Sequence, residues 1–171
     1  VSFEDYKPGD KLVPYKVLDG KLKGSDLVGI RYEQLIPWFN PGEGAFKVIP
    51  GDYVTTEDGT GIVHIAPTFG ADDAKVARLA GVPGLQVVDR NGDLQAQVDL
   101  RGRFFCVEDL DPEYAAANMS PEYAEWAGRY VKNAYDAELP ADAPTLDVDI
   151  CVMLKQQNKA FKVEKHTHNY P

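Results

Sequence analysis

The residues most able to do chemistry lie together in the run 59–73, Gly-Thr-Gly-Ile-Val-His-Ile-Ala-Pro-Thr-Phe-Gly-Ala-Asp-Asp. This run holds the histidine His64 and two adjacent carboxylates, Asp72 and Asp73. Imidazole and carboxylate groups are common carriers of protons in enzymes. The glycines on either side of Thr60 let the backbone approach a ligand closely, because they have no side chain. The run therefore predicts a small polar site.

An extended segment and a helix must position these groups. The apolar residues around His64 predict a strand over 62–66, which Pro67 ends. Residues 71–80 predict a helix, with Gly81 after its last turn. The free N–H groups of its first turn favour negative charge by about 0.3–1 kcal/mol. A carboxylate there that also faces a pocket is a good anchor for the ammonium group of an amino acid.

The same residues also have ordinary structural explanations. A histidine on a strand is more often structural than catalytic, and an aspartate at a helix start is more often a cap. Two adjacent aspartates cannot point the same way, so Asp72 and Asp73 could divide the two tasks. The pattern alone leaves these alternatives open.

Short strands are predicted through the first part of the chain and helices toward its end. The extended runs are residues 11–18, 27–32, 45–49, 53–56 and 85–88, and Asn91-Gly92 marks a hairpin. Strands followed by helices indicate an α+β fold rather than a regular βαβ sheet. We find no linker, so we expect a single domain over 1–171.

Two helix starts in the last third follow one rule. Asp111-Pro112 and Ser120-Pro121 each place an N-cap residue before a proline at the first helical position. A further helix is predicted over 148–159. In the second helix one buried face is expected from four residues at three- and four-residue steps: Tyr123, Trp126, Tyr130 and Ala134.

The composition limits the class of protein. The chain has 171 residues, 44% hydrophobic and 26% charged, which is ordinary for a globular protein. It shows no signal peptide and no membrane-length apolar run. Its net charge of −9 argues against tight binding to nucleic acid through the phosphates by the chain alone. Cys106 and Cys151 lack a zinc-binding spacing and are expected to be buried, reduced thiols. Because the chain lacks an initiator Met, we expect a piece of a longer protein.

The run 59–73 closely resembles the signature of the editing domain inserted in the catalytic core of isoleucyl-tRNA synthetases. Residues 51–55 and 165–171 fit the same family, so the likeness spans nearly the whole chain. The related valyl and leucyl editing domains share Gly-Thr-Gly and a downstream aspartate, but typically carry another residue at the position of His64. The resemblance implies a β-barrel-like, mostly antiparallel core with peripheral helices.

The resemblance also implies roles for the residues. Asp73 matches the aspartate that binds the α-ammonium of a misattached amino acid. His64 matches the histidine that admits valine to the pocket and excludes isoleucine. These two are the expected catalytic pair, and the expected substrate-binding residues are Gly59, Thr60, Gly61, Phe69, Gly70 and Asp72. A second, smaller pocket is useful because one missing methylene changes binding by only ~1–3 kcal/mol. Hydrolysis would use water as the nucleophile, since no Gly-x-Ser-x-Gly elbow is present.

The implied partners are the 3′ end of isoleucine tRNA carrying valine and the rest of the parent synthetase. We expect a cytoplasmic monomer with no membrane association. No metal or cofactor is expected in this domain, since ATP is used at the parent's synthetic site. Candidate tRNA contacts are Lys155, Lys159 and Lys162.

The chain departs from the family in one respect. We find no threonine-rich segment, which forms one wall of the family's pocket, and Thr55-Thr56 lies in the wrong place to be it. We therefore expect weak or no hydrolysis by this chain alone.

Three alternatives stay open. One is an editing domain of the valyl or leucyl type, and another is a non-catalytic binding module. The third is a metal-dependent hydrolase, although its possible ligands lack a spacing such as H-E-x-x-H: His64, Asp72, Asp73, His166 and His168.

Overall fold

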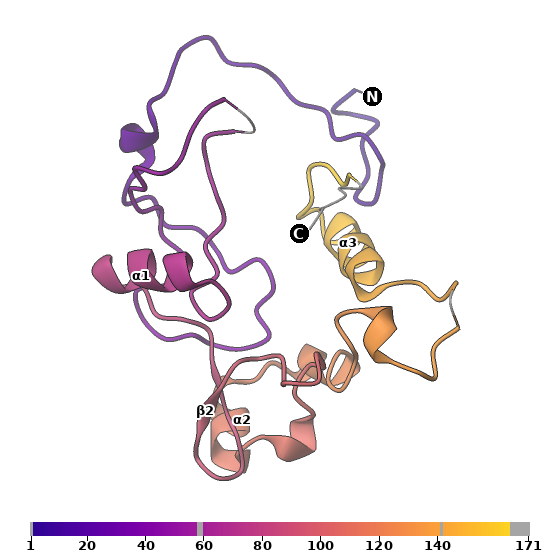
Figure 1. Ribbon diagram of the computed structural model, residues 1–171. Coiled ribbons are helices and arrows are strands. Elements are labelled where there is room, and N and C mark those ends of the chain that lie inside the picture. Colours follow the sequence, from indigo (N-terminus) through magenta and orange to yellow (C-terminus); the bar gives the residue numbers. More distant parts are fainter. Residues whose placement is uncertain (1, 58–59, 141, 165–171) are drawn as a thin grey trace. The chain divides into compact units, whose positions relative to one another are not determined.

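The computed structural model describes residues 2–57, 60–140 and 142–164 (Figure 1). The chain divides into two compact units. One unit is residues 20–129, and the other combines residues 1–19 with 130–171. Each unit is described by itself below, and the single domain expected from the sequence remains a prediction.

An aromatic cluster forms the core of the unit of residues 20–129. The Trp38 ring lies 5.5 Å from that of Phe104, 5.8 Å from Tyr123 and 5.1 Å from Trp126, measured between centroids. These separations are typical of aromatic pairs that attract each other. Tyr123 is fully buried, and its hydroxyl donates a hydrogen bond to the Phe105 carbonyl oxygen at 2.7 Å. The predicted burial of Tyr123 and Trp126 is therefore confirmed.

The predicted hairpin forms. Strand β1 (Val87–Val88) pairs antiparallel with β2 (Leu94–Gln95), in the register Val87 to Gln95 and Val88 to Leu94. Gly92 takes the left-handed conformation that the turn requires, with φ 85°. The Asp89 carboxylate accepts hydrogen bonds from the backbone N–H groups of Asn91 at 2.9 Å and Asp93 at 3.0 Å. These contacts close the turn locally.

The other predicted strands do not form ladders among the described residues. Residues 11–18, 53–56 and 62–66 contain no strand, and the 3-10 helix η1 (Gly24–Leu27) ends where one was expected to begin. Residues 29–32 and 46–48 pair only briefly, through an isolated antiparallel bridge between Arg31 and Lys47. Glycine and proline within or beside these runs shorten the pairing.

The described fold is thus mixed α and β with one open, two-stranded sheet. A closed barrel-like core, which the family resemblance implies, is not shown by this part of the chain.

The helix predictions are confirmed in part. Helix α1 is Ala71–Leu79, α2 is Pro112–Asn118 and α3 is Leu146–Gln156, each close to an expected position. The helix expected from Ser120 through Ala134 is wrong. The chain forms the 3-10 helix η3 (Pro121–Glu125) there in place of a continuous α-helix and turns at Gly128, φ 77°. Two further 3-10 helices are η2 (Val107–Asp109) and η4 (Asn133–Tyr135).

Helix α3 organises the other unit. The Lys155 ammonium donates hydrogen bonds to the carbonyl oxygens of Asp10 at 3.2 Å, Lys11 at 3.3 Å and Phe161 at 3.2 Å. The ring of Tyr15 meets that of Phe161 edge to face at 5.6 Å. These contacts tie residues 10–15 to α3 and the segment after it.

Both cysteines are free thiols. Cys106 is buried as expected, and burial raises the pKa of its thiol. Cys151 is only half-buried. None of the helices in the described ranges is both long and apolar enough to cross a membrane.

Candidate functional site

A hollow of about 340 Å³ lies beside Thr60 and Gly61. The hollow is lined by Tyr53, Val54, Thr55, Thr60, Gly61, Ile62 and Val63. Gly61 has φ 75°, and a β-carbon there would lie 3.1 Å from the Thr56 methyl carbon. A side chain at position 61 would therefore be both strained and crowded. Gly59, the first residue of the predicted site, lies outside the described residues.

Asp73 closes the loop between the His64 segment and α1. Its Oδ2 atom accepts a hydrogen bond from the Ala66 backbone N–H at 2.8 Å. The Ala66 carbonyl oxygen in turn accepts from the N–H groups of Phe69 at 2.9 Å and Gly70 at 3.1 Å. Asp73 therefore holds the start of α1 against the loop. This role is structural, but it is not the helix cap that the sequence pattern predicted, because α1 has no side-chain cap hydrogen bond.

One oxygen of Asp73 remains available. Its Oδ1 atom has no hydrogen-bond partner among the described residues, and the side chain is only half-buried. A carboxylate has about four lone-pair positions, so one bond to Ala66 leaves room for a ligand. Asp73 can hold its loop and bind a cation at the same time.

Gly70 is required by the position of that carboxylate. A β-carbon at Gly70 would lie 3.0 Å from the Asp73 Oδ2 atom and 3.1 Å from its Cγ atom. The backbone of Gly70 is extended, with φ −122°, so the requirement is one of space and not of conformation. Any side chain at this position would push the Asp73 carboxylate aside.

The remaining predicted residues lie on the surface of this loop and helix start. His64 and Asp72 are exposed, and Phe69 is 62% exposed. Neither a hydrogen bond nor an ion pair joins His64 to Asp73 in the described part of the chain. The structure brings the two together only through Ala66, which follows His64 by two residues and binds Asp73. His64, Phe69, Asp72 and Asp73 do not line the 340 Å³ hollow.

Two further residues of this region were not predicted from the sequence. The Thr68 hydroxyl donates to the Leu85 carbonyl oxygen at 2.7 Å and so fastens the loop to the segment before β1. Thr55, which the family pattern set aside, lines the hollow beside Thr60. The Thr68 contact joins segments 17 residues apart, so the local pattern holds no signal for it.

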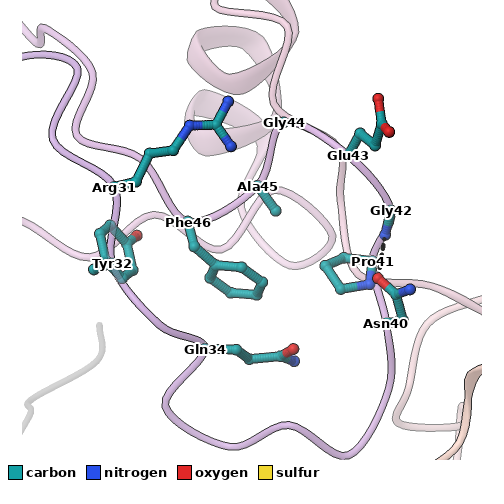
Figure 2. A pocket seen from close by; sticks show the side chains of 10 residues that line it. All are labelled: Arg31, Tyr32, Gln34, Asn40, Pro41, Gly42, Glu43, Gly44, Ala45 and Phe46. Atoms are coloured by element: carbon teal, nitrogen blue, oxygen red, sulfur yellow. Dashed lines mark hydrogen bonds between the residues drawn. The ribbon is translucent and has the colours of Figure 1, made fainter.

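A second hollow, of about 760 Å³, lies between residues 31 and 46 (Figure 2). Its lining residues are Arg31, Tyr32, Gln34, Asn40, Pro41, Gly42, Glu43, Gly44, Ala45 and Phe46. Phe46 has φ 55°, a left-handed conformation that costs a residue with a side chain roughly 1–2 kcal/mol. The sequence pattern predicted an extended run over 45–49 and gave no signal for the unusual backbone of Phe46.

The metal-site alternative gains no support from the described residues. Within them, no three His, Cys, Asp or Glu side chains are grouped as metal ligands would be. His166 and His168 lie outside the described residues.

Comparison with known proteins places the chain in a family. It is 61% identical over 172 aligned residues to an isoleucine--tRNA ligase of Bacteroides fragilis, which covers 100% of this chain and 15% of that protein. An isoleucine--tRNA ligase of Porphyromonas gingivalis is 61% identical over 97% of the chain and 15% of its own length. The chain belongs to the isoleucine--tRNA ligase family.

The similarity to isoleucine--tRNA ligases extends to more distant members. The enzyme of Thermoplasma acidophilum is 38% identical over 88% of this chain and 11% of its own length. No protein-family model matches the chain. The chain thus spans about 15% of the length of the Bacteroides fragilis and Porphyromonas gingivalis enzymes. The alignment with the former includes the whole run 59–73.

Proposed function

We propose that this chain is the editing module of an isoleucine--tRNA ligase, which hydrolyses the ester between valine and isoleucine tRNA. Membership of the ligase family and the resemblance of the run 59–73 to the editing signature support this proposal. The observation that carries it is the Asp73 carboxylate, which Ala66 fixes beside the His64 segment while Oδ1 stays free.

The proposed chemistry follows from these groups. The ammonium group of the misattached valine donates a charge-assisted hydrogen bond to Asp73. The exposed ring of His64 limits the space for the amino-acid side chain, so that one extra methyl group is excluded. Water attacks the ester carbonyl carbon, and the ribose oxygen of the tRNA leaves. Site groups and the terminal ribose position that water.

The proposal includes partners and location. The 3′ end of isoleucine tRNA and the rest of the synthetase deliver the substrate, and the module needs no metal or cofactor of its own. ATP is used at the synthetic site elsewhere in the enzyme. A cytoplasmic location, a monomeric module and the barrel-like core of the family belong to the same proposal.

Calorimetry with two non-hydrolysable aminoacyl-adenosine analogues tests the proposal. We expect the valine analogue to bind at least about tenfold more tightly than the isoleucine analogue, because an excluded methyl group is worth ~1–3 kcal/mol. Asp73→Ala should abolish binding of the valine analogue. Equal affinity for the two analogues would indicate a binding module without editing specificity and would reject the proposal.

A further inference from the structure

The hollow between residues 31 and 46 has the groups that recognise a nucleotide. Arg31 and Tyr32 lie on one side of it, the Phe46 ring lies in the middle, and Asn40 and Pro41 lie across from them (Figure 2). A guanidinium beside aromatic rings suits a ligand that joins a phosphate to a planar base.

Arg31 is free to bind an anion. Its side chain is exposed and makes no hydrogen bond or ion pair with any described residue. Its backbone is held by the antiparallel bridge to Lys47, so the start of the side chain is fixed. The neighbouring Lys47 ammonium is already engaged, because it donates to the Ala80 carbonyl oxygen at 2.9 Å. Arg31 is therefore the cation that this hollow offers to a phosphate.

Two aromatic rings offer a surface for a base. The rings of Tyr32 and Phe46 meet edge to face, with centroids 6.0 Å apart and planes at 72°. Tyr32 is 54% exposed, which leaves much of its ring accessible. Phe46 holds its ring in the hollow from a left-handed backbone, φ 55°, that glycine would adopt without strain. Strain of this kind tends to be kept where a side chain is needed for function.

Two amide side chains that line the hollow are also held in place by hydrogen bonds. Gln34 donates from Nε2 to the Phe39 carbonyl oxygen at 2.9 Å, and Asn40 Oδ1 accepts from the Gly42 N–H at 2.9 Å. These bonds fix both amides and leave the Gln34 oxygen and the Asn40 amino group for a ligand. Glu43 lines the rim and opposes an anion there, so the phosphate belongs on the side of Arg31.

Helix α1 connects this hollow to the candidate editing residues. The wall of the hollow meets the C-terminal end of α1, where a β-carbon at Gly44 would lie 3.1 Å from the Gly81 carbonyl oxygen. Asp73 lies in the first turn of the same helix. A helix of this length spans about 14 Å, so the two sites lie at opposite ends of one rigid element.

We propose that the hollow between residues 31 and 46 binds one nucleotide of a single-stranded RNA. Its phosphate pairs with Arg31, and its base packs against Tyr32 and Phe46. This inference rests on the proposed function in one respect. The RNA strand is the one whose aminoacylated 3′ end lies at Asp73, so the nucleotide bound in the hollow is upstream of that end.

Chemical-shift mapping of backbone amides in the 171-residue chain tests the site. The probes are adenosine 5′-monophosphate, adenosine, inorganic phosphate and a single-stranded adenosine trinucleotide. We expect the monophosphate to shift amides of residues 31–46, and the trinucleotide to do so at lower concentration. Inorganic phosphate binding as tightly as the monophosphate would overturn the proposal, as would shifts confined to other residues. Tighter binding of the free monophosphate than of the trinucleotide would overturn the assignment to an RNA strand.

Matched variants identify the groups involved. Arg31→Gln should weaken monophosphate binding about tenfold and leave adenosine binding unchanged, since only the phosphate contact is lost. Tyr32→Leu should weaken binding of both. Arg90→Gln makes the same charge change at an exposed arginine away from the hollow, and should change neither affinity. An equal loss in the Arg31 and Arg90 variants would show a non-specific charge effect and contradict the proposal.

The failure of this inference can be told apart from failure of the proposed function. Asp73→Asn should remove the preference for the valine analogue while monophosphate binding stays unchanged. Valine preference without monophosphate binding would overturn the nucleotide site alone. Monophosphate binding without valine preference would overturn the editing proposal and leave the nucleotide site standing.

Discussion

Asp73 has two separable tasks at the scale of a single residue. Oδ2 accepts from the Ala66 N–H and closes the loop before α1, whereas Oδ1 is open to a ligand. Asparagine can keep an oxygen acceptor for Ala66 but carries no charge. Alanine loses both the acceptor and the charge. A pair of variants therefore distinguishes the structural role from the binding role.

We expect Asp73→Ala to lower the free energy of unfolding by about 1 kcal/mol, because the half-buried Ala66 N–H loses its acceptor. Asp73→Asn should keep most of that stability, yet both variants should lose the valine analogue. Urea denaturation of the three proteins measures the difference. Equal free energies of unfolding for Asp73→Ala and Asp73→Asn would show that the hydrogen bond from the Ala66 N–H does not stabilise the chain.

Tyr123 gives the chain a predictable response to alkali. Burial raises the pKa of its hydroxyl above the ordinary value near 10, so the folded chain keeps this proton at a pH where the unfolded chain releases it. The unfolded state then binds fewer protons, and the free energy of unfolding falls as pH rises above about 10, by up to ~1.4 kcal/mol per pH unit. Below that pH the contribution is fully present.

Tyr123→Phe should reduce this alkaline loss. It should also lower stability at neutral pH by about 0.5–1.5 kcal/mol, since the hydrogen bond to the Phe105 carbonyl oxygen disappears. In Tyr123→Phe the free energy of unfolding should still fall with pH in this range, with a smaller slope, because burial also raises the pKa of Tyr114. Denaturation midpoints measured from pH 8 to 11 test the prediction, and identical slopes in the two proteins would refute it.

At the scale of elements, two similar sequences start two different helices. Asp111 precedes α2, and its Oδ1 atom accepts from the Tyr114 N–H at 2.7 Å. Ser120 precedes η3 and makes no such cap, because its hydroxyl is bonded to Glu122. The rule that an N-cap residue precedes a proline at the first helical position is correct for α2. For η3 it predicts only where the helix begins.

The substitution Asp111→Ala should cost roughly 0.5–2 kcal/mol of stability, the range for loss of a helix cap. Ser120→Ala should cost clearly less, since no backbone N–H of η3 loses a side-chain acceptor. Thermal or urea unfolding of the two variants provides the comparison. A loss for Asp111→Ala no greater than that for Ser120→Ala would contradict the stabilising role of the α2 cap.

The sequence correctly predicted the elements whose turns and ends are set by residues close to them in the chain. Asn91-Gly92 specifies its own turn, and Gly81 ends α1 with φ 64°. The strand expected over 62–66 needed a pairing partner that no local pattern names, and the structure instead fastens this segment through Ala66 and Asp73. Pairing between distant segments depends on the whole chain, which is why strand predictions failed more often than helix predictions.

At the scale of the whole molecule, the site residues named from the sequence remain a prediction, and the contacts around them could not be predicted from the sequence. His64 and Asp73 follow from the run 59–73, whereas the hydrogen bond through Ala66 does not. The larger hollow was missed because it depends on Phe46 taking a positive φ, which a large side chain rarely does. The sequence thus proposes the chemical groups of the site, and the structure adds the hydrogen bond that holds the Asp73 carboxylate.

The activity of the chain alone should be weak. The resemblance to editing domains implies a pocket with one threonine-rich wall, and residues 1–171 contain no such segment. We therefore expect valyl-tRNA incubated with this chain to lose valine at a rate close to that in buffer. Deacylation assays with and without the chain measure this, and rapid release of valine would contradict the expectation.

The central claim is that the His64 ring and the Asp73 carboxylate hold one small branched amino acid. The most direct measurement is a nuclear Overhauser experiment on the chain saturated with the non-hydrolysable valine analogue. The claim predicts cross-peaks between the valine methyl protons and the ring protons of His64, and their disappearance in Asp73→Asn. A bound analogue whose methyl groups show contacts elsewhere and none to His64 would contradict it.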